Sequence, residues 1–422
     1  MAAALVPRRP WKDRRVVLGV TGGIAAYKSV QIARDLTRLG AIVDVALTRA
    51  AQKFVAPLSF EGVTGRPALT HLFSAEGAAL HIRLGREADV VCVAPAGADF
   101  IARAAQGRAD DLICTTLLAT RAPVLVCPAM NDRMFAHAQV QANLRHLSEE
   151  LCYQVVGPAE GALAVGEGQG PGRMLEPWQI EEAVGRALTG MTALSGTRVL
   201  VTAGPTREAI DAVRYVGNRS SGRMGYALAA AAWRRGADVT LVSGPSPLEV
   251  PFGVEVVRVE TAREMDDVVA ARIEEADVTV FAAAVADYRP SEPKERKMKR
   301  RDVGDDLTLS LVENPDIALG TLSSRKAGSV CVGFALETDD LESNALAKLE
   351  GKKFDLLVAN DATEDGAGFE VDTNRVTLFH ASGEREPMPL MSKDDVAEEI
   401  LDRVSVLRGD IGDGSTSDGA AR

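Results

Sequence analysis

Residues 201–225 combine the groups that proteins use to hold an anion. Glycines let backbone N–H groups approach a ligand closely, and neighbouring serines add hydroxyl donors. The residues in question are Gly204, Gly217, Gly222, Gly225, Ser220 and Ser221. An apolar run, 198–202, precedes the stretch, and a small-residue segment from about Met224 predicts a helix whose N-terminus favours an anion. The stretch therefore predicts a phosphate-binding loop, with a plain glycine-rich connection as the alternative.

This loop matches neither of the common nucleotide motifs. It has no P-loop lysine and no G-x-G-x-x-G spacing. Arg207 and Arg214 can balance anionic charge, and Asn218 offers a neutral amide that both donates and accepts hydrogen bonds. The loop therefore suits a phosphorylated ligand without being a standard nucleotide motif.

A basic cluster follows a second apolar run. The segment SEPKERKMKRRD places Lys294, Lys297 and four further cations in an otherwise acidic chain. Charge runs of this kind are usually solvated surface loops. Because this one follows the predicted strand 278–281 and Asp287, it can instead fold over bound phosphates as a lid that excludes water.

The first half of the chain has its own set of loops after predicted strands. The residues that could surround a phosphorylated cofactor are Gly22, Gly23, Ile24, Thr48, Pro95, Gly97 and Asp99. Two further residues could act on a substrate. A neutral imidazole at His81 can take a proton, and Asn131 can hydrogen-bond a carboxylate without repelling it. A histidine satisfied at a helix start and a turn residue after Pro128 are the alternatives.

Two strand–helix–strand openings position these loops. Residues 15–20, 25–39 and 42–47 form the first, and residues 198–202, 224–235 and 239–242 form the second. Each opening predicts a doubly wound, Rossmann-like α/β domain, in which ligands gather at the carboxyl ends of the strands. We place the domains at residues 15–189 and 196–407 and expect residues 408–422 to be a disordered tail.

Composition narrows the classes of function. The 422 residues carry a formal charge of −11, which argues against general nucleic-acid binding, and no run of apolar residues is long enough to span a membrane. The five cysteines show neither paired spacing nor Cys/His metal spacing, so we predict no protein metal site. With no signal-like leader, these features predict a cytoplasmic enzyme of small molecules.

The second half resembles the phosphopantothenate–cysteine ligases. The segment from Gly204 to Gly225 reads GPTRE and then D-x-V-R-Y-x-x-N-x-S-S-G-x-M-G, and Lys297-Met298-Lys299 and Asn314-Pro315-Asp316-Ile317 follow in the family's order. The resemblance implies that 4′-phosphopantothenate and L-cysteine are joined through an acyl-cytidylate made from CTP, with Mg²⁺ screening the triphosphate.

The resemblance also assigns residues. For CTP it implies Ala282, Ala283, Asp287, Lys297, Pro315, Asp316, Ile317, Phe334, Lys348 and Lys352. For the phosphorylated substrate it implies Gly204, Arg214, Asn218, Ser220, Ser221 and Gly222. Lys297 would assist attack on the acyl-cytidylate, which Asn218 would orient. Arg214 would reach the phosphopantothenate of the neighbouring subunit, which implies a ligase dimer. Two alternatives stay open, since Asp287 could read the ribose or the substrate, and Lys348 and Lys352 could be a solvated helix face.

The first half resembles the flavodoxin-like flavoproteins that decarboxylate phosphopantothenoylcysteine. The matching segments are His81-Ile82-x-Leu84, Pro128-Ala129-Met130-Asn131 and Gly170-Pro171-Gly172-Arg173-Met174. They imply an FMN cofactor with Met130 beside it, His81 and Asn131 as catalytic residues, and Arg173 and Met174 near the substrate. Decarboxylases of this kind form trimers or larger shells. The whole chain thus resembles the bifunctional proteins of coenzyme A biosynthesis.

One residue departs from that pattern. Val165 stands where the flap of these decarboxylases has a cysteine that supplies a proton to the final reduction. An isopropyl group cannot donate a proton, which leaves three readings. Cys127 or Cys152 could substitute, the reaction could stop at the oxidised enethiol, or the half could bind flavin as a scaffold without turnover.

Overall fold

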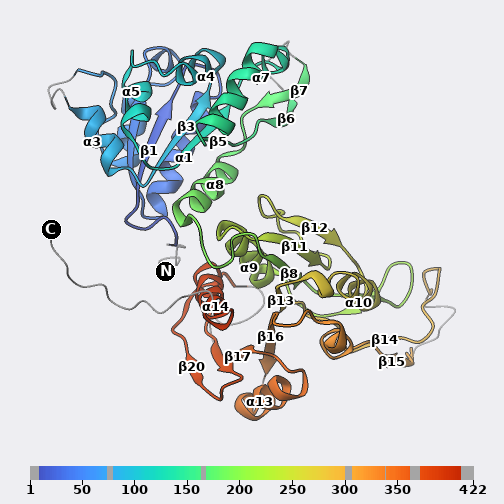
Figure 1. Ribbon diagram of the computed structural model, residues 1–422. Coiled ribbons are helices and arrows are strands. Elements are labelled where there is room, and N and C mark those ends of the chain that lie inside the picture. The colour runs from blue at the N-terminus through green and yellow to red at the C-terminus, as the bar shows by residue number, and fades with distance from the viewer. Residues whose placement is uncertain are drawn as a thin grey trace, which may run out of the picture. The chain divides into compact units, whose positions relative to one another are not determined.

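The computed structural model describes residues 9–73, 79–162, 168–299, 307–337, 339–361 and 371–409. The chain divides into two compact units, one reaching to Gly190 and the other beginning at Met191 (Figure 1). The predicted flap position Val165, the lid residues Arg300 and Arg301, and most of the predicted tail lie outside the described residues.

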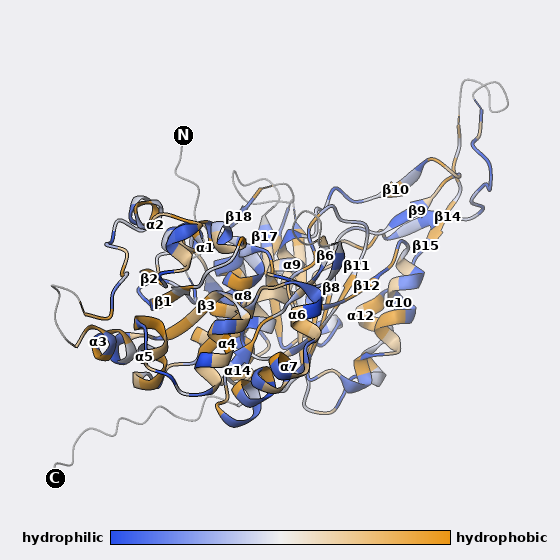
Figure 2. Ribbon diagram, turned by 90° about the horizontal axis from the view of Figure 1, so that it is seen from above, coloured by the Kyte–Doolittle hydropathy of each residue, from blue (hydrophilic) through white to orange (hydrophobic). Residues whose placement is uncertain are grey.

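The N-terminal unit is built on a parallel sheet of five strands. Its order is β2-β1-β3-β4-β5, the flavodoxin-like order. The strands are β1 (Arg15–Val20), β2 (Ile42–Leu47), β3 (Val90–Ala96), β4 (Val124–Pro128) and β5 (Gln154–Val155). β1 and β3 are rich in valine and coloured as hydrophobic in Figure 2, as expected of strands covered on both faces.

Helices cover both faces of this sheet. The core on one face is shared with α3 (Leu80–Glu87), α4 (Ala98–Ala105), α5 (Leu112–Ala119) and α7 (Ala138–Arg145). α1 (Ala26–Arg38) and α8 (Pro177–Thr189) pack together against the other face. The remaining elements are α2 (Pro57–Thr64), α6 (Asp132–Ala136) and the antiparallel pair β6 (Ala159–Ala162) and β7 (Gln169–Arg173). Glu176 and Gln179 form a capping box that starts α8.

The C-terminal unit has a sheet of eight strands in the order β12-β11-β8-β13-β16-β17-β19-β20. The first six are parallel, and in chain order they read 3-2-1-4-5-6, the dinucleotide-fold order. Their bounds are β8 (Arg198–Ala203), β11 (Asp238–Ser243), β12 (Glu255–Arg258), β13 (Val278–Phe281), β16 (Val330–Glu337) and β17 (Leu356–Asp361). The antiparallel β19 (Thr377–His380) and β20 (Arg385–Pro387) extend the edge.

Helices again cover both faces. α9 (Arg223–Arg234) and α14 (Lys393–Leu407) share one core, and α10 (Ala262–Ala270), α12 (Ile317–Gly320) and α13 (Leu341–Gly351) lie on the opposite face. The two doubly wound α/β domains predicted from the sequence are thereby confirmed.

Residues 207–217, expected to be loop, instead contain an antiparallel hairpin of β9 (Arg207–Ala209) and β10 (Tyr215–Gly217). The Asp211 carboxylate closes its turn, accepting hydrogen bonds from the backbone N–H groups of Val213 and Arg214, each at 2.9 Å. The hairpin lies beside a second pair, β14 (Tyr288–Pro290) and β15 (Leu311–Glu313), and the two form an arm of the C-terminal unit (Figure 2). We call these two strand pairs, together with the described residues that connect the strands of each pair, the arm.

Candidate active sites

A cavity of about 730 Å³ opens at the carboxyl ends of β8, β13 and β16. Thr202, Phe281 and Phe334 contribute to its wall from these three strands, and the N-terminus of α9 completes one side. The strand order reverses between β8 and β13, so this is the switch point at which open α/β sheets bind ligands.

Most of the predicted ligase residues meet in this cavity. Those that line it are Asn218, Ser220, Ser221, Gly222, Ala282, Ala283, Asp287, Pro315, Asp316, Ile317, Phe334, Lys348 and Lys352. They come from segments more than a hundred residues apart in the chain. Gly204, Arg214 and Lys297 are not among the lining residues.

Gly204 does not line the cavity itself but contacts Gly222, which does. Gly222, the residue before α9, has φ +83°, and a Cβ there would lie 3.2 Å from the Gly204 Cα. Only glycine therefore suits position 222, on grounds of both backbone conformation and close approach. The two glycines bring the N-terminus of α9 down onto the loop after β8.

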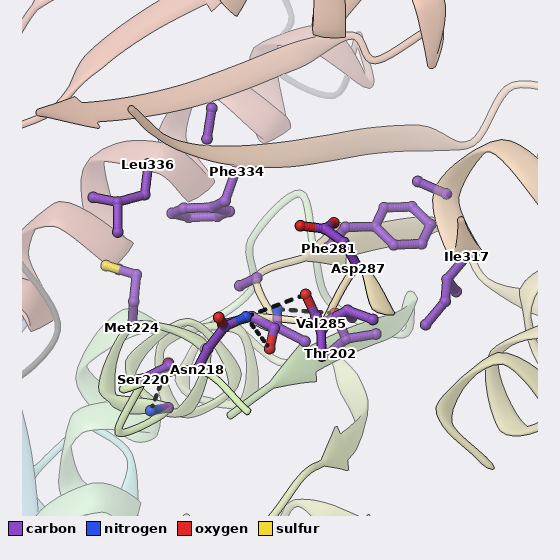
Figure 3. A pocket seen from close by; sticks show the side chains of 18 of the residues that line it. Thr202, Asn218, Ser220, Met224, Phe281, Val285, Asp287, Ile317, Phe334 and Leu336 are labelled. Carbon is purple, nitrogen blue, oxygen red and sulfur yellow. Dashed lines mark hydrogen bonds between the residues drawn. The ribbon is translucent and has the colours of Figure 1, made fainter. Parts of the chain in front are cut away.

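Asn218 is held by the loop that follows β13. Its Nδ2 donates to the backbone carbonyls of Ala284 at 3.0 Å and Val285 at 3.2 Å. Figure 3 shows Asn218 with Ser220 and Met224 on one side and with Asp287 and Ile317 on the other. The amide is thus fixed between the α9 end of the cavity and the β13 end.

Two lysines, Lys348 and Lys352, line the cavity from α13 and its C-terminal end, and α13 covers the face of the sheet opposite to α9. The Lys352 Nζ lies 2.9 Å from an Asp316 carboxylate oxygen. Although burial of Asp316 acts in the opposite direction, the hydrogen bond from Lys352 holds the pKa of that carboxyl below its usual range. Burial, together with the Lys352 charge, lowers the pKa of Lys348. This end is therefore a partly desolvated cationic site, which favours a polyanion.

Among the described residues of the predicted lid, 291–299, none lines the cavity. Lys297 is exposed, and its neighbour Met298 is tied to the arm by a backbone N–H donated to Asp211 at 3.1 Å. Arg214 donates to the same carboxylate from its Nε at 3.0 Å and to the Met298 carbonyl at 3.1 Å. The hydrogen bonds from Arg214 lower the pKa of Asp211. Lys297 and Arg214 thus belong to the arm.

Asn374 and Lys393 also line this cavity, and the sequence analysis did not identify them. Both lie in a small antiparallel pair, β18 (Thr373–Asn374) and β21 (Met391–Ser392), or directly after it. Ser392 followed by Asp395 signals the start of α14 in the sequence, but nothing local shows that the first residue of that helix faces a ligand.

The N-terminal unit has a second cavity, of about 740 Å³, at the carboxyl ends of β1, β2, β3 and β4. The predicted residues that line it are Gly22, Gly23, Ile24, Thr48, Gly97, Asp99, Met130, Asn131, Arg173 and Met174. Thr21 joins two of the loops, because its Oγ1 donates to the Pro95 carbonyl at 2.8 Å and accepts from the Gly97 N–H at 3.1 Å. Pro95 itself does not line the cavity.

The pair β6 and β7 reaches the cavity through Gly172. A Cβ at this residue, where φ is +147°, would lie 2.2 Å from the Met130 carbonyl oxygen, and the Met130 N–H donates to the Gly172 carbonyl at 3.0 Å. The absence of a side chain at Gly172 is what lets β7 bring Arg173 and Met174 to the loop after β4.

The two predicted catalytic residues occupy different settings. Asn131 lines the cavity and also caps α6, since its Oδ1 accepts from the Arg133 N–H at 3.0 Å. His81 lies at the start of α3 and does not line the cavity. Its Nδ1 is buried and has no hydrogen-bond partner within the described ranges.

Neither cysteine considered as a substitute for the flap residue lines the cavity. Cys127 is fully buried in β4, where a hydrogen bond to Cys92 and burial raise the pKa of its thiol. Cys152 is exposed at a left-handed position with φ +55°. A third thiol, Cys114, contacts a residue that lines the cavity, since Arg103 donates to its sulfur at 3.6 Å. Burial, however, raises the pKa of this thiol to about 12.

Two family models cover nearly the whole chain. The model described as Flavoprotein matches residues 6–189, and the model described as DNA/pantothenate metabolism flavoprotein C-terminal domain matches residues 194–407. The coenzyme A biosynthesis bifunctional protein of Vibrio vulnificus is 46% identical over 398 residues, which cover 94% of this chain and 98% of the relative. The chain belongs to the family of bifunctional coenzyme A biosynthesis proteins.

A second relative matches over nearly the whole chain, and a solved structure matches over about half of it. The Escherichia coli protein is 44% identical over 394 residues, covering 93% of this chain and 96% of its own length. The solved C-terminal domain of a bifunctional coenzyme A biosynthesis protein is 38% identical, covers 52% of this chain and 98% of that chain, and has a TM-score of 0.44.

Membership of the coenzyme A biosynthesis family confirms the resemblance inferred from the sequence. The chain accordingly has a flavoprotein decarboxylase half and a ligase half that act on small molecules. Among the helices that the structure describes, none has both the length and the apolar character needed to cross a bilayer.

Proposed function

We propose that the C-terminal half joins 4′-phosphopantothenate to L-cysteine, using CTP and Mg²⁺ through an acyl-cytidylate. The observation that carries this proposal is one cavity with an anion-binding group at each end and Asn218 fixed between them. This reaction must hold phosphopantothenate and CTP, both of them phosphorylated, with the carboxylate of one beside the α-phosphate of the other, and this geometry allows it.

Each end of the cavity then has one ligand. Ser220, Ser221 and the N-terminus of α9 hold the phosphorylated acyl substrate. Lys348 and Lys352 hold the triphosphate, beside the apolar wall of Ile317 and Phe334, and magnesium enters with that triphosphate.

The reaction proceeds in two steps between these ends. The substrate carboxylate attacks the α-phosphorus of CTP and releases pyrophosphate, and the cysteine amine then attacks the acyl carbon and releases CMP. Asn218 orients the carbonyl of the intermediate, while Asp287 faces the ribose or the substrate. Lys297 assists the second step only after the segment that carries it leaves the arm and closes over the cavity.

A single assay tests the ligase proposal. Full-length protein mixed with phosphopantothenate, cysteine, CTP and MgCl₂ should release pyrophosphate and CMP in equal amounts, and omission of phosphopantothenate should stop both. Release no greater than that of a blank without protein would contradict the proposal.

We propose that the N-terminal half binds FMN and decarboxylates the ligase product, 4′-phosphopantothenoylcysteine. The residues of the 740 Å³ cavity fit such a cofactor. A Cβ at Gly23 would meet no atom within 4 Å, and one at Gly97 would lie 3.5 Å from the Gly22 carbonyl, so the loops form an open cradle. When bound, FMN supplies the oxidation, by accepting a hydride equivalent from the cysteinyl group.

This chain's own residues hold the substrate in that reaction. Asn131 would bind the carboxylate that leaves as CO₂, Met130 would contact the cofactor, and Arg173 would contact the substrate from β7. His81 takes a proton, and because it lies outside the cavity of its own chain, this role requires a second subunit that brings α3 to the site.

A second candidate function is an oxidative decarboxylation that ends at the enethiol. It is suggested by Val165, which lies outside the described residues. With valine in place of the flap cysteine, and with Cys127 and Cys152 away from the cavity, the reaction stops at the enethiol. The mass of the product distinguishes the candidates: saturated phosphopantetheine shows complete turnover, and a product lighter by two hydrogens shows the enethiol. Unchanged substrate would leave the half as a flavin-binding scaffold.

Exposed apolar side chains support a homo-oligomer built from both halves. On the arm, Val213 and Tyr215 are 61% and 51% exposed, and around α3 and α5, Ile82 and Leu118 are 41% and 57% exposed. We propose that the arm forms the ligase dimer and that the α3–α5 face forms a decarboxylase trimer or larger shell. All five cysteines are free, as suits the reducing cytoplasm in which we place the enzyme.

A further inference from the structure

Two buried polar side chains that no family motif identified form one wall of the ligase cavity. Asn374 is 4% exposed and Lys393 is 6% exposed, and both line the cavity with the residues of the α9 N-terminus. Burying a lysine and an amide is costly unless the site supplies a reason, such as a ligand of complementary charge. This wall is separate in the chain from the glycine- and serine-rich loop that faces it.

Two hydrogen bonds hold Lys393 close to the N-terminus of α9. Its Nζ donates to the Val371 carbonyl at 2.6 Å, and its backbone N–H donates to the Asp372 carbonyl at 3.0 Å. The Asp372 carboxylate in turn accepts from the Arg223 guanidinium at 2.5 Å, and Arg223 is the first residue of α9. An ion pair thus ties the segment that carries Lys393 to the helix N-terminus.

The charges at this end of the cavity favour an anion. Burial lowers the pKa of Lys393 to about 8, and the nearby Arg223 charge acts in the same direction while Asp372 opposes it. A dianion placed between Lys393 and the positive end of the α9 dipole would remove that penalty.

Asn374 provides an independent sign that this wall binds a ligand. Its Oδ1 is buried and has no hydrogen-bond partner in the part of the chain that the structure describes. A buried acceptor of this kind calls for a donor. In 4′-phosphopantothenate a secondary hydroxyl lies close to the phosphate ester and can act as that donor.

We propose that Lys393 and Asn374, facing the N-terminus of α9, form the subsite that recognises the phosphate end of the acyl substrate, so that the ligase selects phosphorylated over unphosphorylated pantothenate. The inference rests on the proposed ligase function. Lys393 donates to a phosphate oxygen, and Asn374 accepts from the neighbouring hydroxyl.

The test compares two substrates on the full-length protein. Pyrophosphate release is measured with phosphopantothenate and with pantothenate, at saturating CTP and cysteine. Lys393→Gln should lower kcat/KM for phosphopantothenate about 10- to 100-fold, the range expected for a lost charge-assisted hydrogen bond, and leave kcat/KM for pantothenate unchanged. Lys393→Arg should recover most of the loss. Lys326→Gln, which removes an exposed lysine paired with Asp277 at 2.5 Å, is the matched control.

The outcomes separate the two proposals. If wild-type protein releases no pyrophosphate with phosphopantothenate, the ligase function itself is wrong. If wild type is active and Lys393→Gln lowers kcat/KM equally for both substrates, or for neither, the proposed subsite is wrong. The proposed ligase function would not be affected by that result. Asn374→Leu gives a second measurement, because it should raise KM for phosphopantothenate while leaving KM for CTP unchanged, and an equal rise in both would also overturn the subsite.

Discussion

The Lys352 ammonium lies 2.9 Å from a carboxylate oxygen of Asp316, and both side chains line the ligase cavity. Lys348, one helical turn earlier on α13, also lines it. The carboxylate balances one of two like charges that would otherwise repel each other. A triphosphate entering this end of the cavity would find both lysines already positioned.

This pair leads to the first prediction. Lys352→Met should raise KM for CTP about 10- to 100-fold, because a charge-assisted hydrogen bond to phosphate is lost, while KM for cysteine stays unchanged. The measurement is pyrophosphate release as CTP is varied. Lys353→Met is the control, since Lys353 is exposed and does not line the cavity. An equal effect of both variants would show that the charge at Lys352 has no particular role.

The sequence predicted those parts of the two sites that lie on strand ends and glycine turns. Gly22, Gly97, Ala283 and Gly222 follow strands or precede helices, and such positions are visible in hydrophobic periodicity and in turn residues. The parallel topology then brings them together at one edge of each sheet.

The sequence could not predict residues whose place depends on packing between distant segments. Lys393 and Asn374 reach the ligase cavity only because β18 pairs with β21 and Asp372 pairs with Arg223, some 150 residues away. Lys297 is the converse case. Its position in a basic run suggested contact with phosphate, but Asp211 and Arg214 tie the neighbouring backbone to the arm.

A second prediction concerns the flavin cavity. Gly172→Ala should lower the amount of flavin that copurifies with the protein, because the added Cβ would lie 2.2 Å from the Met130 carbonyl and force β7 away from the loop. The ratio of absorbance near 450 nm to that at 280 nm measures the loss. Gly62→Ala, inside α2 with no atom within 4 Å of the new Cβ, should leave that ratio unchanged. Full flavin retention by Gly172→Ala would rule out this role for the close approach.

A third prediction tests the arm as a subunit interface. Val312→Asp in β15 places a charge on a strand whose residues Leu311 and Val312 are 44% and 38% exposed. If the arm buries these side chains against a second copy, the charge should lower the assembly mass measured by light scattering, since an unpaired buried charge is costly. Glu384→Gln, an exposed change outside the arm, should leave the mass unchanged. An unaltered mass for Val312→Asp would place the ligase interface elsewhere.

A fourth prediction concerns stability and pH in the N-terminal unit. Burial raises the pKa of Glu181 to about 8, and the charges of Asp35 and Glu182 add to the effect. The folded state therefore binds a proton more tightly than the unfolded state, so stability is highest below the ordinary glutamate pKa and falls as pH rises toward 8.

Glu181→Gln should remove that fall. At pH 8 the variant should gain about 4 kcal/mol over wild type in urea unfolding of the N-terminal unit, and at pH 4.5 it should gain little. Glu61→Gln, at a residue whose carboxylate accepts a hydrogen bond from the Ala68 N–H at 3.3 Å, is the comparison. A gain that is the same at both pH values would point to a cause other than ionisation of Glu181.

A fifth prediction follows from the charge on Lys393. Because the pKa of this residue is about 8 in the free protein, kcat/KM for phosphopantothenate should fall about tenfold per pH unit above pH 8. The charged groups that face it are Arg223 and Asp372. Lys393→Arg should abolish the fall, since a guanidinium keeps its proton.

When CTP is varied at saturating phosphopantothenate, the bound phosphate already holds Lys393 protonated, so the break should be absent there. A break near pH 8 that survives in Lys393→Arg would assign the titration to another group and remove the lysine from the phosphate subsite.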